Sequence, residues 1–158
     1  MYGTVRATMD ADLVVDLHAE QIQQFAAHLE PAFYFEPSTI LDALQYSRSF
    51  NLIHRDTMFK VDIFPMPHQP FENSQMQRRV LQILSDQPED RAYFTTAEDI
   101  ILAKLVWYRL GGEISDHQWK DILGVIHVQN DRLDLKYLHL WAYQLNLADL
   151  LERAFGEY

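Results

Sequence analysis

Two aspartates stand two residues apart, directly before an apolar, β-branched stretch: Asp10 and Asp12 lead into Leu13-Val14-Val15. Side chains alternate between the two faces of a strand, so a strand that begins here places both carboxylates on one face. Adjacent carboxylates repel each other, and a bound divalent cation relieves that repulsion. The pair therefore indicates a metal site, and the alternative interpretation is a solvated strand entrance.

A third aspartate lies inside a second apolar segment, Phe59–Phe64. The same alternation places Lys60 and Asp62 on one face and the neighbouring apolar side chains on the other. A carboxylate in so apolar a strand is costly to bury unless it is paired or binds a metal ion. If this strand lies beside the first, three carboxylates converge and could hold Mg²⁺ against the phosphates of a nucleotide. The alternative is an edge-strand acid that faces water.

Lys104 is the one charged residue in the apolar run between Asp99 and Arg109. A lysine in such a helix requires an anion close to its ammonium group. Asp121 on the following helix and Glu98 are candidate protein partners, and either pair would simply hold two helices together. The alternative partner is a phosphate group of a ligand.

Other chemistry has less support in this sequence. The seven histidines show no His-Glu-x-x-His pattern or other metal-ligand spacing, so we interpret most of them as surface or core-edge residues. The chain has no cysteine, which excludes thiol nucleophiles and thiolate metal sites. No Gly-x-Ser-x-Gly, P-loop or Gly-x-Gly-x-x-Gly motif occurs. The three tryptophans fall one per predicted helix, which favours a helical core over a base-stacking surface.

Composition limits the class of protein further. The chain has 158 residues, of which 48% are hydrophobic, enough for a sizeable core. The net charge is −10 and there is no basic run, so we expect no broad nucleic-acid surface. No apolar run is long enough for a membrane span and no export signal is evident, so we expect a cytoplasmic protein that binds no membrane.

The hydrophobic periodicity predicts an α+β fold, a mixed sheet with flanking helices followed by a helical C-terminal part. Thr95-Thr96-Ala97-Glu98 matches a capping box, Ser115 begins the next helix in the same way, and Gly111-Gly112 ends the helix between them. We predict an α/β part over 1–94 and a helical part over 95–158, packed as one compact unit. Strands are expected at 11–17, 33–35, 49–55, 58–64, 80–84 and 92–95, and helices at 19–29, from 38, 71–77, 95–111, from 115, 134–145 and 147–156.

Four motifs occur in an order that resembles the nucleotidyltransferase-like superfamily, in particular its bacterial abortive-infection and toxin–antitoxin branch. They are Arg6-Ala7-Thr8-Met9-Asp10-Ala11-Asp12, Phe59-Lys60-Val61-Asp62-Ile63, Glu98-Asp99-Ile100-Ile101-Leu102-Ala103-Lys104-Leu105, and the element from Asp116 to Asp121-Ile122. The resemblance implies that Asp10, Asp12 and Asp62 bind Mg²⁺ or act in catalysis. It also implies that Arg6, Thr8, Lys60, Lys104 and Asp121 line the nucleotide site, although loop hydrogen bonding is an alternative for Arg6 and Thr8.

The sequence departs from that family before its first aspartate. The superfamily places a Gly-Gly or Gly-Ser turn, which holds the triphosphate through backbone amides, well upstream, whereas only Met1–Met9 precede Asp10 here. The sequence as written thus lacks the phosphate turn, and two interpretations follow: the chain start is misplaced, or the protein has lost that segment and with it ordinary catalysis. Two functions follow: Mg²⁺-dependent transfer of a nucleoside monophosphate from a nucleoside triphosphate to an unknown acceptor, or a catalytically inactive domain that binds a nucleotide or a protein. A homodimer is one form that the second could take.

Overall fold

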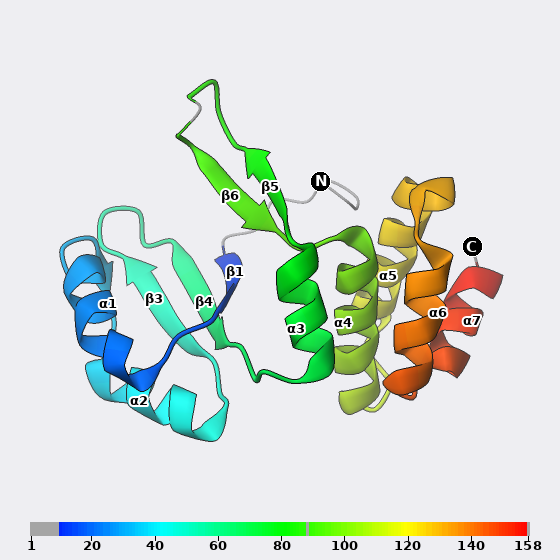
Figure 1. The fold of residues 1–158 in the computed structure, drawn as a ribbon, viewed down its shortest axis with the longest axis horizontal. Coiled ribbons are helices and arrows are strands. Elements are labelled where there is room, and N and C mark those ends of the chain that lie inside the picture. The colour runs from blue at the N-terminus through cyan, green and yellow to red at the C-terminus, as the bar shows by residue number, and fades with distance from the viewer. Residues whose placement is uncertain (1–9, 88, 158) are drawn as a thin grey trace. The chain divides into compact units, whose positions relative to one another are not determined.

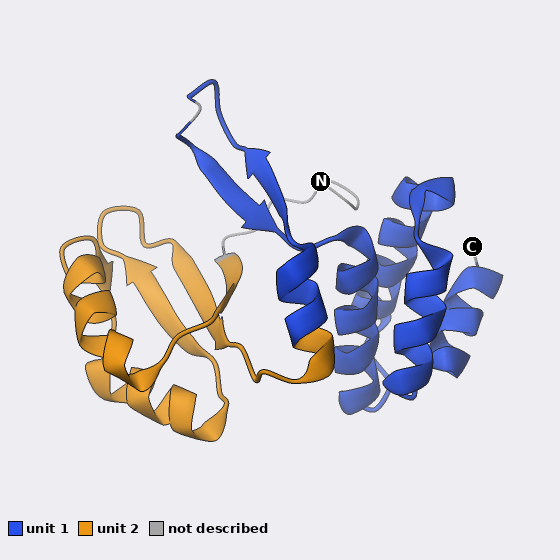
Figure 2. Ribbon diagram, in the orientation of Figure 1, with its two compact units in different colours: residues 1–5, 73–158 blue, residues 6–72 orange. Residues whose placement is uncertain are grey.

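The computed structural model describes residues 10–87 and 89–157, and of Asp10 it describes the backbone alone. The chain divides into two compact units (Figure 2). One unit ends at Glu72 and contains the four-stranded sheet. The other contains Asn73 and the residues that follow it, and it is mainly helical. Each unit is described by itself below.

The sheet of the first unit has the strand order β1-β4-β3-β2 (Figure 1). β1 runs parallel to β4, while β3 is antiparallel to both β4 and β2. Two helices, the first preceded by a short 3-10 turn at Ala19–Gln21, connect these strands. The elements are β1 (Asp10–Val15), α1 (Ile22–Leu29), β2 (Phe33–Tyr34), α2 (Pro37–Tyr46), β3 (Phe50–His54) and β4 (Lys60–Pro65).

One face of this sheet is covered by α1 and α2. The alternation of β4 buries Val61 and Ile63 against these helices, where the side chain of Ile40 is fully enclosed. Since successive side chains point to opposite faces, Lys60 and Asp62 lie on the other face of the same strand. The core therefore fixes which face of the sheet carries charge. The buried members of this core are Ile22, Ile40, Ala43, Phe50, Leu52, Val61 and Ile63.

The second unit combines a β-hairpin with a helical bundle. The hairpin extends away from the helices of this unit, whose core is formed largely by the fully buried Ile101, Leu105, Ile122 and Leu138. In the described chain no helix has both the length and the apolar character of a membrane span. The elements are α3 (Pro70–Arg78), which begins just before the unit boundary, β5 (Val80–Ile83), β6 (Arg91–Phe94), α4 (Ala97–Leu110), α5 (Asp116–Gln129), α6 (Leu135–Gln144) and α7 (Ala148–Gly156).

This architecture confirms the predicted fold, a mixed sheet flanked by helices with a helical C-terminal region. The units are divided differently from the prediction of one compact body with parts 1–94 and 95–158. The division falls between Glu72 and Asn73, because most of α3 belongs with the helices and β5 pairs with β6 instead of joining the larger sheet. The predicted capping box is also shifted by one residue. Thr96 is the N-cap of α4 and accepts a hydrogen bond from the backbone of Asp99.

Candidate functional site

The polar face of the sheet brings two of the predicted metal ligands together. In the parallel pair of β1 and β4, Asp12 lies in register with Asp62, and Asp10 lies in register with Lys60. Residues in register on neighbouring strands are about 5 Å apart and point to the same face. The sequence analysis made convergence of these carboxylates conditional on the two strands lying side by side. The structure meets that condition for Asp12 and Asp62.

Asp62 already has a cationic neighbour. The Nζ of Lys60 lies 2.8 Å from an Oδ of Asp62, whose side chain is 16% exposed. The two residues are separated by one position on β4, so the alternation that buries Val61 places them side by side. This ion pair accounts for the carboxylate in an apolar strand without requiring a metal ion. It also places a positive charge where a phosphate group could approach.

A third oxygen donor, which the sequence did not indicate, lies in the same row. Asn51 on β3 is in register with Asp62, so Asp12, Asp62 and Asn51 cross three adjacent strands on one face. Asn51 is exposed. Its position depends on the register of the β3–β4 hairpin, whose five-residue connection includes Met58 at φ 57°. The strands predicted at 49–55 and 58–64 imply the same register, because pairing residue 55 with residue 58 also sets Asn51 opposite Asp62.

Three of the predicted site features lie outside the described residues. Arg6 and Thr8 fall in the segment before Asp10, and the side chain of Asp10 is not described. Their proposed roles in binding phosphate and metal therefore stay predictions.

Lys104 and Asp121 belong to the helical unit, where they contact each other. The Nζ of Lys104 donates a hydrogen bond of 2.9 Å to an Oδ of Asp121, joining α4 to α5. Both side chains are about one third exposed, and the Nδ1 of His117 lies 3.8 Å from the same oxygen. Of the two protein partners considered for Lys104, Asp121 is the one found, whereas Glu98 contacts Arg78. This pairing supports the interpretation that Lys104 holds two helices together.

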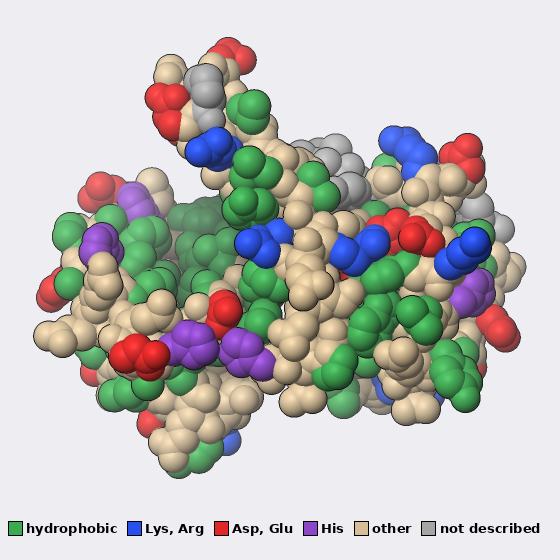
Figure 3. All heavy atoms as spheres, viewed as in Figure 1, with side chains coloured by type: hydrophobic (Ala, Val, Ile, Leu, Met, Phe, Trp, Pro, Cys, Tyr) green, Lys and Arg blue, Asp and Glu red, His purple; other side chains and the backbone are tan. Residues whose placement is uncertain are grey.

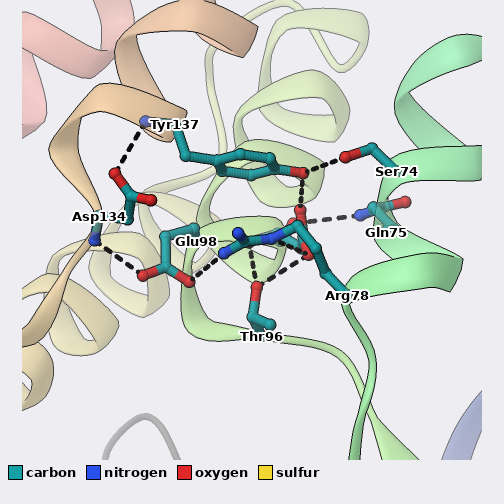
Figure 4. Close-up of polar contacts among 8 residues, drawn as sticks. Ser74, Gln75, Arg78, Thr96, Glu98, Asp134 and Tyr137 are labelled. Carbon is teal, nitrogen blue, oxygen red and sulfur yellow. Dashed lines mark hydrogen bonds and ion pairs between the residues drawn. The ribbon is translucent and has the colours of Figure 1, made fainter.

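The Glu98-Asp99 pair lies in a buried polar network that joins α3, α4 and α6 (Figure 4). Glu98 accepts hydrogen bonds from Arg78 at 3.2 Å and from the backbone N–H of Asp134 at 2.9 Å. The hydroxyl of Tyr137 donates to Asp99 at 2.7 Å, and Thr96 donates to the other oxygen of Asp99 at 2.8 Å. Asp99 is completely buried, so these donors replace its lost hydration.

This polar network has a structural role: it holds the three helices together. The guanidinium of Arg78 stacks 3.8 Å from the ring centroid of Tyr137 and lies 3.6 Å from the carboxylate of Asp99. Burial raises the pKa of Tyr137 well above its ordinary value, so its phenol keeps its proton and remains a donor. With each charge paired inside the unit, the motif Glu98-Asp99 stabilises the packing of the helices.

A separate group of potential metal ligands lies at the ends of β1 and β4. Asp16, His18 and His68 each offer one ligand atom, and these atoms all lie within 4.8 Å of one another, so the group could bind a metal ion. Figure 3 shows adjoining histidine side chains with acidic side chains beside them. The sequence interpretation missed this group because His18 and His68 are fifty positions apart in the chain. The carboxyl ends of parallel strands meet at one edge of a sheet, and this rule could have predicted that the residues after the two strands lie close together.

Comparison with known proteins adds no assignment. No protein-family model matches the chain, and no curated protein is significantly similar to it.

Proposed function

We propose that this protein is nucleotidyltransferase-like and binds a Mg²⁺–nucleoside triphosphate on the polar face of its sheet. The observation that carries the proposal is the register of Asp12 beside Asp62 on parallel strands. Mg²⁺ is held in proteins by one or two carboxylates together with water and substrate phosphates, and Asn51 adds a third oxygen donor to the same row. The donor set therefore fits this cation.

The proposed roles follow from the positions of these side chains. Asp12 and Asp62 would hold the cation, and Asp62 would also accept the proton of the acceptor hydroxyl as its oxygen bonds the α-phosphorus and the bond to pyrophosphate breaks. The ammonium of Lys60, 2.8 Å from Asp62, contacts the phosphates. Bound Mg²⁺ would neutralise the charge that develops on the triphosphate during in-line displacement of pyrophosphate. The sheet supplies positioning, which alone lowers the barrier of a transfer between two bound reactants.

Calorimetric titration with each of the four common nucleoside triphosphates, with and without Mg²⁺, tests the binding step. We expect Mg²⁺-dependent binding by the wild-type protein and at least a tenfold loss of affinity in Asp12→Asn and Asp62→Asn. Asp42→Asn, which changes an exposed acid on α2, is the matched control and should bind normally. Absence of Mg²⁺-dependent heat from the wild-type protein, or equal binding by all variants, would refute the proposal.

A second candidate function is a nucleotide-binding module without transferase activity. The Lys60–Asp62 ion pair favours it, since an ammonium group neutralises the carboxylate that a second cation would need. Incubation with an α-labelled triphosphate and candidate acceptors separates the two functions. Release of pyrophosphate with transfer of the label supports the enzyme, whereas recovery of intact bound nucleotide supports the module.

A further inference from the structure

We infer that Asp16, His18 and His68 form a binding site for a first-row transition-metal ion of the Zn²⁺ class, distinct from the proposed Mg²⁺–nucleotide site. Two imidazole nitrogens and one carboxylate oxygen are a donor set that Zn²⁺ accepts readily. Mg²⁺ prefers oxygen ligands in an octahedral shell, so the same group selects against it.

Two of the three distances between the ligand atoms match those around a small tetrahedral ion. The Nε2 atoms of His18 and His68 each lie 3.4 Å from the same Oδ of Asp16. For bonds of about 2.0–2.1 Å, neighbouring ligand atoms of a tetrahedral Zn²⁺ are about 3.3–3.4 Å apart. The two rings stack nearly parallel, with centroids 5.7 Å apart and an angle of 12° between them. The Nε2 distances show that both imidazoles present the same nitrogen toward one oxygen of Asp16.

The backbone holds the two ligand-bearing segments close together. Val15 is in register with Pro65, and the N–H of Met66 donates a 2.9 Å hydrogen bond to the carbonyl of Val15, which extends the parallel pairing to the ends of both strands. His68 has a φ of 54°, a left-handed conformation that is uncommon outside glycine. Such a conformation persists where surrounding structure or function requires it.

The site is accessible to ions and has room for an additional ligand. The side chains of Asp16, His18 and His68 are 46%, 54% and 49% exposed, so an ion can reach them from solvent. His18 and His68 also border a depression of about 460 Å³ whose apolar lining includes Leu41, Leu44 and Pro67. Three protein ligands leave a fourth tetrahedral position for water or for a group bound in that depression.

Titration of the chelator-treated full chain with ZnCl₂, followed calorimetrically, tests the inference. We expect one high-affinity Zn²⁺ site per chain, and at least a tenfold loss of its affinity in each of Asp16→Asn, His18→Ala and His68→Ala. CoCl₂ provides a second readout, since tetrahedral Co²⁺ absorbs strongly in the visible range and this band should disappear in the same three variants. Circular dichroism of the metal-free variants checks that each retains the fold.

Matched histidine variants separate a built site from binding to any surface imidazole. His28→Ala on α1 and His139→Ala on α6 remove exposed histidines elsewhere and should leave the Zn²⁺ affinity unchanged. Asp12→Asn and Asp62→Asn should also bind Zn²⁺ normally, which keeps this result independent of the nucleotide proposal. Absence of stoichiometric binding, or equal losses in the histidine controls, would overturn the inference.

Discussion

Asp12 and Asp62 lie in register across the parallel strands β1 and β4, and the ammonium of Lys60 is 2.8 Å from the Asp62 carboxylate. The ammonium and a divalent cation are therefore alternative neutralising partners for the same carboxylate. A cation that binds Asp62 must share it with Lys60 or displace that side chain, which is 43% exposed. In the proposed site, Lys60 would consequently oppose binding of the free cation but attract a cation–phosphate complex.

Replacing Lys60 should move these two affinities in opposite directions. In Lys60→Ala we expect tighter binding of Mn²⁺, a spectroscopic substitute for Mg²⁺, by roughly fivefold, since a Coulomb term of about 1 kcal/mol is removed. Affinity for the Mg²⁺–triphosphate should fall, because a phosphate contact is lost. Electron paramagnetic resonance of Mn²⁺ and calorimetry measure the two quantities.

Lys136→Ala is the control for the general loss of one positive charge, since Lys136 is exposed on α6. It should leave both affinities unchanged. A parallel change in cation and nucleotide affinity in Lys60→Ala would contradict the dual role of this lysine.

The Lys104–Asp121 hydrogen bond predicts energetic coupling between α4 and α5. Lys104→Met and Asp121→Asn should each lower the free energy of unfolding, and the double variant should lose less than the sum, with a coupling of about 0.5–1 kcal/mol for a pair of this exposure. Urea denaturation of the wild type, the two single variants and the double variant completes the double-mutant cycle. Because Lys104 is already paired, we expect the affinity for Mg²⁺–triphosphate to change by less than twofold. A coupling near zero together with a tenfold loss of nucleotide affinity would instead favour a phosphate contact.

Local signals in the sequence were sufficient to predict most of the fold. The alternation around Asp62 identified the charged face of β4, and Ser115 caps α5 as predicted, accepting a hydrogen bond from the backbone of Gln118. These features depend on residues only a few positions apart. The partner of Lys104 was also among those predicted, because adjacent helices bring a lysine in one close to an acid in the next.

Features that depend on distant residues could be predicted from the sequence only on the condition of a particular packing or strand order. To predict the ion pair between Arg78 and Asp99, one must know that α3 packs on α4. To predict that His68 approaches Asp16, one must know the order of the strands in the sheet. The same limit explains the boundary between the units. Nothing local distinguishes a hairpin such as β5–β6 from two more strands of the larger sheet.

The Tyr137–Asp99 hydrogen bond predicts a pH-dependent contribution to stability. Tyr137→Phe keeps the ring beneath Arg78 but leaves one oxygen of the fully buried Asp99 without this donor, which should cost about 1–3 kcal/mol. Burial raises the pKa of Tyr137 above its ordinary value of 10.0, so the folded protein keeps a proton that the unfolded chain releases. The stabilisation is therefore fully present below pH 10 and decreases as the pH rises further.

The difference in unfolding free energy between wild type and Tyr137→Phe should be constant from pH 7 to about 9 and should narrow toward pH 11. Urea denaturation across this range measures it, with Tyr143→Phe, which alters a 78% exposed tyrosine, as the control that should match wild type throughout. A difference that stays constant through pH 11 would mean that Tyr137 ionises equally in both states, which its burial beside Asp99 argues against.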